Sequence, residues 1–225
     1  MKVFFVFFVF LFCLPPIVLG AFDFYLLSLQ WPPGYCYQSN STYNQCKQPF
    51  PMSFTIHGLW PQNYSHSLPL PCPQAPPFNL NEVTSDPQLF QNMNALWPNL
   101  LRVKNSIFWG NEWTKHGTCT TFTQHDYFQT TCGLALSLNQ LLGELQNNGM
   151  SPGRSYPLND YKATIESAYN VTPLIACNRH FQSRAVQMFE IRFCVDPTAN
   201  DFINCAWTVS KSCGSSSSSP IAFTM

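Results

Sequence analysis

The chain has 225 residues, of which 10% are charged and 16% are aromatic. Its 11 lysines and arginines balance its 11 aspartates and glutamates, so the formal net charge is zero. This balance excludes proteins that hold nucleic acid by overall positive charge, and any affinity for a polyanion must come from a local site. The many aromatic side chains favour stacking surfaces over electrostatic capture.

Residues 1–20 are predicted to be a secretory signal peptide. Lys2 precedes an almost uninterrupted apolar run that ends in small residues at Val18 and Gly20. The run is shorter than the ~20 residues that a membrane-spanning helix needs, and no later stretch is long or apolar enough. We therefore expect cleavage after Gly20, a secreted protein without membrane attachment, and one domain over 21–225, because a chain of this length can bury one substantial core.

The first predicted element after the signal is a strand over 22–31. Aromatic and leucine side chains occupy both of its faces, which is typical of a strand buried on both sides, and a Pro-Pro-Gly turn ends it. Gln30 is a polar side chain near its end and therefore a candidate for binding rather than packing. The segment 36–46 is expected to be a short loop closed by its own cysteines.

A second β-type run over 54–61 delivers His57 directly into a glycine turn and Trp60. The segment 63–81 follows. It is rich in proline and serine without any periodicity, which indicates a loop, and Cys72 in its middle is the obvious tether.

A helix is predicted to begin at Asp86 and Pro87, as N-cap and first-turn residue, and to end at Pro98. Its apolar stripe consists of Leu89, Met93, Leu96 and Trp97.

The segment 108–119 is predicted to be a helix that Gly117 ends. Helical spacing places Glu112 and Lys115 on one face, with His116 beside them. A carboxylate, an ammonium group and an imidazole within one turn suit proton transfer at a developing anion. Taken alone, the turn also fits an exposed ion pair beside an ordinary histidine, but the second histidine segment at 54–61 favours chemistry.

The C-terminal half mixes helices and strands. An amphipathic helix capped by Asp126 is expected to run to Gly149, with Cys132 as a small buried residue, and a shorter helix to start at Asn159. The last predicted elements are a strand over 186–195, its hairpin partner over 202–207 and a flexible tail over 214–225. Helices segregated from strands in this way predict an α+β domain.

Cysteines and glycosylation motifs fit a secreted protein. Cleavage of the signal removes Cys13 and leaves nine cysteines, which indicates four disulfides and one cysteine left over. Asn-X-Ser/Thr sequons stand at Asn40, Asn63 and Asn170.

Two histidines on separate elements, with a glutamate and a lysine near the second, are the groups needed for in-line transesterification at phosphorus. One imidazole takes a proton from a nucleophilic hydroxyl and the other gives a proton to the leaving oxygen, while lysine stabilises the charge on phosphate. No metal is required. If the nucleophile is the substrate's own 2′-hydroxyl, the substrate is RNA and the first product is a 2′,3′-cyclic phosphate.

The segments FTIHGLWP and FWGNEWTKHGTC resemble the two active-site segments of the T2 ribonuclease family. The similarity extends through FDFYLLSLQWPP, LWPNLLR and the four downstream cysteines, so it covers most of the mature chain. The resemblance implies a single α+β domain with a central antiparallel sheet flanked by several helices and stapled by disulfides. It implies a metal-independent endoribonuclease for single-stranded RNA that needs no cofactor and acts as a monomer.

The resemblance also implies roles for individual residues. His116 would be the general base and His57 the general acid, while Glu112 and Lys115 would stabilise the pentacoordinate phosphorane. Trp60 would line the substrate site. The pocket for the nucleobase would be formed by Gln30, Asn99, Leu101 and Phe108. Considered alone, Phe108 fits core packing equally well.

The disulfides implied by the resemblance are Cys36–Cys46, Cys72–Cys119, Cys177–Cys213 and Cys194–Cys205, which leaves Cys132 unpaired.

Asn111 departs from the family pattern, because many members have a third histidine just before the glutamate. An amide can donate a hydrogen bond to phosphate but brings no charge, so weaker substrate binding is expected while the two-histidine chemistry survives. The missing histidine, the sequon just after HGLWPQ and the segments MSPGRSYPL and PTANDFINC are similar to plant pistil S-type chains, whereas the neutral charge favours the S-like enzymes. Together these features favour the S-type lineage, which acts in self-incompatibility. An S-type protein would have a pollen-side recognition partner.

Two rival interpretations remain. A zinc hydrolase could use His57, His116 and Glu112, but the chain has no HExxH helix. A catalytically inactive storage or binding protein could share the scaffold, although retention of both histidines disfavours it. The other histidines lack a companion carboxylate at useful spacing and are expected at the surface: His66, His125 and His180.

Overall fold

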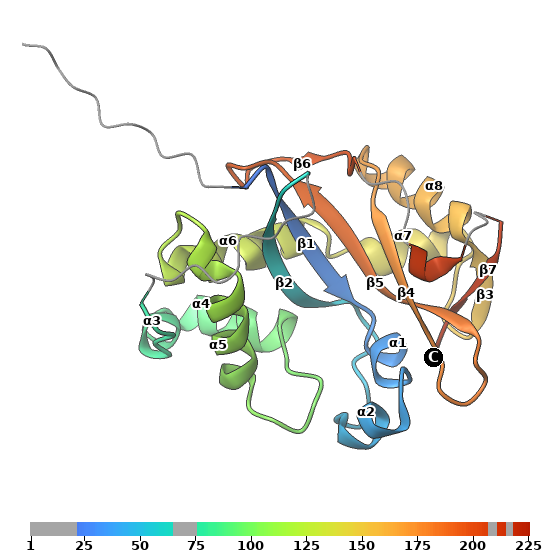
Figure 1. Cartoon of the computed structure of the whole chain (residues 1–225), viewed down its shortest axis with the longest axis horizontal. Coiled ribbons are helices and arrows are strands. Elements are labelled where there is room, and N and C mark those ends of the chain that lie inside the picture. Colours follow the sequence, from blue (N-terminus) through green and yellow to red (C-terminus); the bar gives the residue numbers. More distant parts are fainter. Residues whose placement is uncertain (1–21, 65–75, 207–210, 215–217) are drawn as a thin grey trace, which may run out of the picture.

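The computed structural model describes residues 22–64, 76–206, 211–214 and 218–225 (Figure 1). Several predictions fall outside these described residues: the signal peptide over 1–20, His66, Cys72 and Trp207.

A seven-stranded sheet forms the centre of the molecule, with strand order β2-β1-β5-β7-β3 and with β4 and β6 paired to β5. All of its pairings are antiparallel except a parallel contact between β5 and β7. The strands are β1 Phe24–Gln30, β2 Thr55–Gln62, β3 Arg154–Pro157, β4 Leu174–Arg179, β5 Val186–Val195, β6 Phe202–Ile203 and β7 Pro220–Phe223.

Strand β1 lies between β2 and β5, and every one of its residues is buried, as its apolar residues on both faces predict. Its last residue, Gln30, pairs with Thr55 of β2 and with Glu190 of β5. The register therefore brings three strand segments to one position, and His57 lies two residues beyond Thr55.

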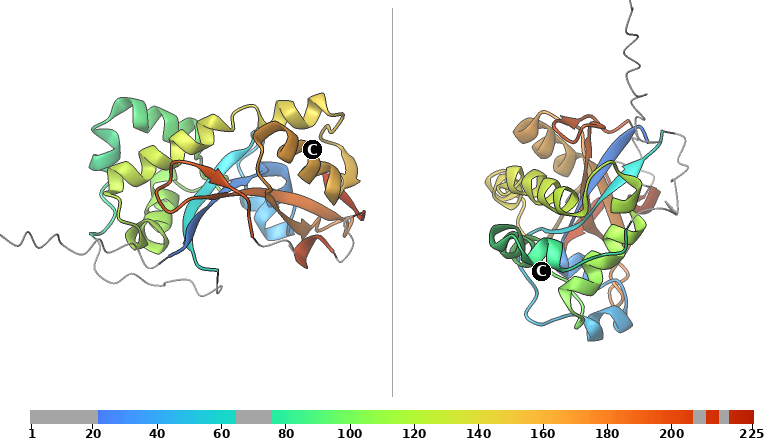
Figure 2. Two further views of the ribbon diagram at one scale, coloured as in Figure 1. Left: turned by 90° about the horizontal axis from the view of Figure 1, so that it is seen from above. Right: turned by 90° about the vertical axis from the view of Figure 1, so that its left-hand side faces the viewer.

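Most helices pack against one face of this sheet, and the view from above in Figure 2 shows α6, α7 and α8 arranged along it. The helices are α1 Pro32–Cys36, α2 Asn40–Gln45, α3 Asn81–Thr84, α4 Pro87–Leu96, α5 Asn105–Lys115, α6 Gln124–Ser137, α7 Leu141–Asn147 and α8 Leu158–Tyr169, with short 3-10 helices η1 Gly117–Cys119 and η2 Lys211–Cys213. The main core between helices and sheet is rich in aromatic side chains, and Trp31, Trp97 and Trp109 are among the largest fully buried ones.

Helix α4 confirms its predicted start, because the Asp86 side chain accepts hydrogen bonds from the backbone N–H groups of Gln88 and Leu89. The segment 36–46 differs from the prediction, since it contains helix α2 rather than only a loop. The Ser39 side chain caps that helix by accepting a hydrogen bond from Thr42 N–H.

The predicted helix from Asp126 to Gly149 is in fact two helices, α6 and α7. Thr123, not Asp126, caps α6, because its hydroxyl accepts the Asp126 backbone N–H and donates to the Asp126 carboxylate at 2.7 Å. The capping pair moves the helix start upstream. Gly149 adopts a left-handed φ of 80° just after α7, as a predicted helix stop should.

The predicted flexible tail over 214–225 is wrong for its last part. Pro220–Phe223 form strand β7, in which Ile221 and Phe223 are fully buried. Trp31 Nε1 donates a hydrogen bond of 2.6 Å to the carbonyl oxygen of Thr224. The apolar residues after the serine run pack into the core, because their burial outweighs the cost of ordering the chain end.

Three of the implied disulfides are present, Cys36–Cys46, Cys177–Cys213 and Cys194–Cys205. Cys119 is also disulfide-bonded, and its implied partner Cys72 lies outside the described residues. Cys132 is free and buried in α6, as expected.

In the part of the chain that the structure describes, no helix combines the length and the apolar character needed to cross a bilayer.

Candidate active site

Strand β2 and the C-terminal end of α5 bring the two predicted histidines to one indole ring. His57 lies in β2, and His116 is the C-cap of α5, where its backbone N–H donates to Glu112 O at 2.9 Å. The ring centroids of Trp60 and His57 are 5.0 Å apart, and those of Trp60 and His116 are 5.4 Å apart. Both imidazoles therefore contact the same side chain.

Glu112 lies buried beside this indole. Trp60 Nε1 donates a hydrogen bond of 2.9 Å to Glu112 Oε2, and that oxygen is 4.0 Å from His116 Nε2. Burial raises the pKa of Glu112 above its ordinary value, against the opposing effects of the His57 charge and the indole hydrogen bond. The carboxyl group is thus poised to hold a proton more readily than an exposed glutamate.

His57 has a carboxylate partner that the sequence did not reveal. Its Nδ1 lies 2.5 Å from Oε1 of Glu190, a fully buried residue of β5. The other carboxylate oxygen of Glu190 accepts two hydrogen bonds from Arg192, at 2.8 Å from Nε and 2.5 Å from Nη2. The Arg192 guanidinium lies 5.4 Å from the Trp60 ring centroid, so the chain of contacts closes on the same indole.

The pKa values of the two imidazoles are shifted in opposite directions. Burial alone would lower the pKa of His57, but its hydrogen bond to Glu190 and the charges of Glu190 and Glu112 raise it above its ordinary value. Burial, together with the smaller effects of the His57 and Lys115 charges, lowers the pKa of His116 to about 4. At mildly acid pH the first ring is therefore protonated while the second is neutral.

Lys115 is the exposed last residue of α5, next to His116. Its charge acts on both Glu112 and His116, since it contributes to the pKa of each. The predicted cation thus lies within electrostatic reach of the two groups beside it.

Gly58 separates His57 from Trp60 where a side chain cannot fit. A Cβ atom there would overlap Glu112 Oε2 and Trp60 Nε1. We expect Gly58→Ala to reduce the free energy of unfolding by about 1–3 kcal/mol, because these buried groups cannot both move aside. Thermal or denaturant unfolding measures this loss.

Gly133→Ala is the matched control, because nothing lies within 4 Å of its added Cβ in helix α6. There alanine should be neutral or stabilising. Equal losses at both glycines would contradict the close approach at position 58.

A pocket of about 260 Å³ opens beside His57. Its lining includes the four residues of the implied base pocket and Asn111, whereas the predicted site residue Trp60 does not line it. The residues that line the pocket are Gln30, Tyr35, His57, Asn99, Leu100, Leu101, Val103, Ile107, Phe108 and Asn111. Glu112, Lys115 and His116 do not line it. The half-buried Phe108 ring, 5.9 Å from the His57 ring, faces this pocket rather than serving core packing alone.

Two of the three amide side chains in the pocket, Asn99 and Gln30, have already used part of their hydrogen-bonding capacity. Asn99 Oδ1 accepts the Leu101 backbone N–H at 3.0 Å, which leaves its NH₂ group for a ligand. Gln30 Nε2 donates to Ile56 O at 3.5 Å, which leaves its carbonyl oxygen. The pocket therefore offers at least one donor and one acceptor to a planar ligand edge.

Sequence reasoning missed Tyr35, Glu190 and Arg192. The only signal for the last two was a carboxylate and a guanidinium on one face of an otherwise apolar strand, where burial demands a partner. Nothing in the sequence distinguished Tyr35 from the many other aromatic residues.

Among the described residues, no three histidine, cysteine, aspartate or glutamate side chains are grouped as a metal site would require.

Comparisons with known proteins find similarity along most of the chain. The model of the Ribonuclease T2 family matches residues 22–205. Ribonuclease 1 of Arabidopsis thaliana is 35% identical over 199 residues, which cover 86% of this chain and 84% of that protein. The crystal structure of RNase NT in complex with 5′-AMP matches with a TM-score of 0.76 and 31% identity, covering 90% of this chain and 98% of that one.

A Nicotiana alata ribonuclease, SF11-RNase, which is described as associated with self-incompatibility, is similar at a TM-score of 0.73 and 25% identity. The match covers 91% of this chain and all of that chain, 100%. Because the family model spans most of the sequence and relatives exceed 30% identity over most of both chains, the protein belongs to the ribonuclease T2 family.

Proposed function

We propose that this T2-family endoribonuclease cleaves single-stranded RNA by metal-independent transesterification, with His116 as general base and His57 as general acid. The observation that supports this assignment is the opposite pKa shift of two imidazoles that contact the same indole, Trp60. A base must begin neutral and an acid must begin protonated, and these are the states that the surroundings favour.

In the first step neutral His116 takes the proton of the RNA 2′-hydroxyl, and the 2′-oxygen attacks the adjacent phosphorus. The bond from phosphorus to the 5′-oxygen breaks, and protonated His57 supplies that oxygen with a proton. A 2′,3′-cyclic phosphate results. Lys115 and the protonated carboxyl group of Glu112 stabilise the negative charge that builds on the phosphate oxygens between the two imidazole rings.

The base that stacks on Phe108 in the pocket would present its edge to Gln30 and Asn99. The amide donor of Asn99 and the amide acceptor of Gln30 suit a base edge that carries both an acceptor and a donor. Trp60 contacts both His57, which lines this pocket, and His116.

The pH profile of kcat/KM should be bell-shaped with a mildly acid optimum. Activity falls on the acid side as His116, with its pKa of about 4, becomes protonated and loses its function as a base. On the alkaline side it falls as His57 loses its proton, above the ordinary range of histidine because Glu190 raises that pKa. Initial rates on a dinucleotide between pH 3 and 9 test this, and an optimum above neutrality would reverse the two roles.

Asn111→His should restore a charged phosphate donor at the pocket. Because a charged hydrogen bond exceeds a neutral one by ~1 kcal/mol, KM for RNA should fall about fivefold at pH 5, where the new histidine is protonated. The gain should disappear at pH 8. Asn111→Gln is the control, and an equal KM for both variants at pH 5 would contradict a charge effect.

The proposed function is tested with purified, disulfide-intact protein and single-stranded RNA in excess EDTA. We expect full activity and fragments that end in a 2′,3′-cyclic phosphate, separated by chromatography. Complete inhibition by EDTA would favour a metal hydrolase instead. Absence of cleavage at mildly acid pH would favour the inactive storage or binding protein.

We further propose that the protein is secreted and glycosylated and belongs to the S-type lineage. The apolar segment over 1–20, the exposure of Asn40 and Asn170, and the similarity to SF11-RNase support this proposal. Expression confined to the pistil is expected, together with binding to a pollen-side protein. Expression in other tissues would favour an S-like enzyme of RNA turnover, phosphate scavenging or defence.

A further inference from the structure

The formal net charge of zero conceals an uneven distribution of charge. The segments 24–81, 87–111 and 167–189 contain no aspartate or glutamate. All their lysines and arginines are exposed: Lys47, Arg102, Lys104, Arg179 and Arg184. We call these five residues the basic edge.

The three segments that carry the basic edge are joined by backbone hydrogen bonds. The α1–α2 segment contacts the loop before α5 through Lys47 N–H to Leu100 O and Arg102 N–H to Gln45 O, both at 2.8 Å. It contacts the β4–β5 hairpin through Phe181 N–H to Tyr37 O, at 2.8 Å. Figure 1 shows the loop, α2 and the hairpin side by side along the lower edge of the molecule.

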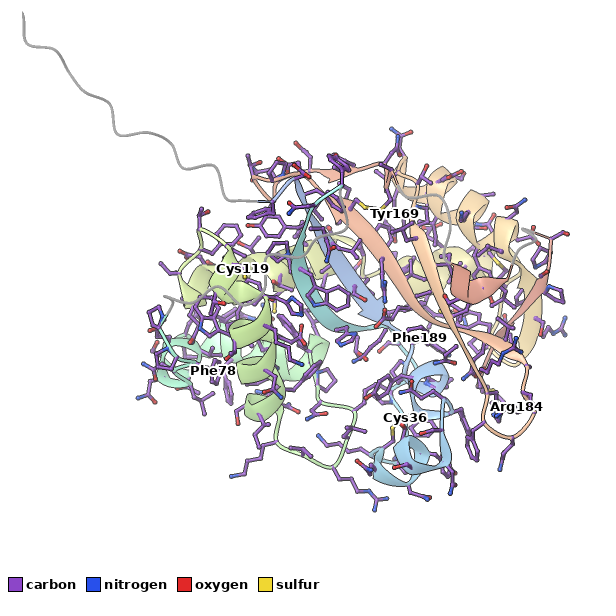
Figure 3. The ribbon with its side chains drawn as sticks, viewed as in Figure 1. Cys36, Phe78, Cys119, Tyr169, Arg184 and Phe189 are labelled. Carbon is purple, nitrogen blue, oxygen red and sulfur yellow. A yellow bond between two sulfur atoms is a disulfide. The ribbon has the colours of Figure 1, made fainter. Side chains whose placement is uncertain are left out.

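A disulfide and ring contacts connect this edge internally, and its charges are not neutralised. The Cys36–Cys46 disulfide links the two ends of the α1–α2 segment. Figure 3 labels Cys36 in that segment and Arg184 on the β4–β5 hairpin. Half-buried rings pack on one another across the segments: Tyr37, Tyr43, Phe50, His180 and Phe181. Within the described ranges none of the five cations forms an ion pair with a carboxylate.

The basic edge continues from the nucleobase pocket. Leu101 and Val103 line the pocket, and the alternate residues Arg102 and Lys104 are exposed beside it. Tyr35 lines the same pocket from α1, in the segment that also carries Lys47. A strand leaving the pocket in this direction meets positive charge without passing any carboxylate of these segments.

We propose that the basic edge binds the phosphates of RNA on the 3′ side of the scissile bond. The proposal rests on the proposed function, because the direction follows from His57 in the pocket wall as the general acid. That group protonates the leaving 5′-oxygen, so the nucleotide in the pocket lies 3′ of the cleaved bond. The next phosphates then lie over Arg102, Lys104 and Lys47.

The test uses DNA oligomers that contain one ribonucleotide, so that cleavage occurs at one bond. One substrate is a dinucleotide, and the others extend it by six deoxynucleotides on the 3′ or the 5′ side. For the natural protein at about 50 mM salt, a 3′ extension should raise kcat/KM about tenfold and a 5′ extension much less. In K47Q/R102Q/K104Q the benefit of the 3′ extension should disappear, while cleavage of the dinucleotide is unchanged.

The control Q88E/Q129E/Q146E changes the net charge by the same amount at exposed positions on α4, α6 and α7. It should keep the 3′ benefit, because it leaves the basic edge intact. The slope of log affinity against log salt should fall by about 2 in the first variant alone, at ~0.7 for each lost phosphate contact. If the variant and the control lost the benefit of the 3′ extension equally, the effect would come from overall charge, and the proposal would be overturned.

An all-deoxy oligomer, which cannot be cleaved, separates this proposal from the proposed function. Salt-dependent binding by the natural protein and not by K47Q/R102Q/K104Q supports the basic edge even if no substrate is cut. Cleavage of the dinucleotide with no effect of 3′ length in the natural protein overturns it. In that case the edge would remain available to an acidic protein partner.

Discussion

Replacing His116 by alanine should lower kcat/KM for RNA by about 10²–10⁴, the range that a positioned general base contributes. The loss should appear mainly in kcat, because His116 does not line the pocket that is proposed to hold the nucleobase. His57→Ala should cause a loss of similar size through the leaving oxygen. Steady-state rates on a dinucleotide at the pH optimum measure both effects.

His125→Ala is the matched control for these variants. The expectation that His125 is a surface residue without a companion carboxylate is wrong, because the ring is half-buried and its Nε2 lies 3.2 Å from Asp86 Oδ2. His125 lies in α6 and is not one of the two histidines at Trp60. Its replacement should leave kcat unchanged. Retention of more than a tenth of the activity in His116→Ala would contradict its role as the base.

Replacing Glu190 by glutamine should move the alkaline limb of the pH profile towards lower pH. The hydrogen bond and charge of Glu190 raise the pKa of His57, so the neutral amide removes most of this support. Near neutral pH kcat/KM should fall by about 10- to 100-fold, a part of the effect of a positioned acid. At the acid end the two proteins should differ much less, because His57 is protonated in both.

Glu166→Gln, on the exposed face of α8, is the matched control and should leave the profile unchanged. Because Glu190 is fully buried, unfolding temperatures of all three proteins are needed to separate misfolding from chemistry. Arg192→Gln keeps the carboxylate on His57 and tests the arrangement independently. Since the Arg192 charge itself lowers the pKa of His57, this variant should move the alkaline limb upwards. If the alkaline limb moved in the same direction in Glu190→Gln and Arg192→Gln, the proposed action of these two residues on the pKa of His57 would be contradicted.

The elements that hold the site were predictable because their sequence patterns are local. Strand β1 has apolar residues on both faces and ends at a Pro-Pro-Gly segment, and α4 has an Asp-Pro start. Strand β7 was not predictable, because Pro220–Phe223 is too short for a pattern and is ordered by distant partners such as Trp31. The division between α6 and α7 was hidden for a similar reason, since the apolar stripe continues through it.

For the candidate site, the motifs predicted the residues on β2 and α5 but not the residue on β5 that hydrogen-bonds to His57. His57, Glu112 and His116 stand in long, specific segments. Glu190 lies 133 residues from His57 and reaches it only through the order of the strands, which no local pattern encodes. The pKa of His57 could not be anticipated for the same reason.

One consequence follows from the register of β1. Gln30 in the pocket pairs with both Thr55, near His57, and Glu190, which holds His57. Selectivity for a base and the strength of the acid are therefore built on one strand position. During evolution, a substitution that retunes base choice at Gln30 should also disturb turnover, so diversification of preference in this lineage is expected to proceed through Asn99 and Leu101, on the loop opposite.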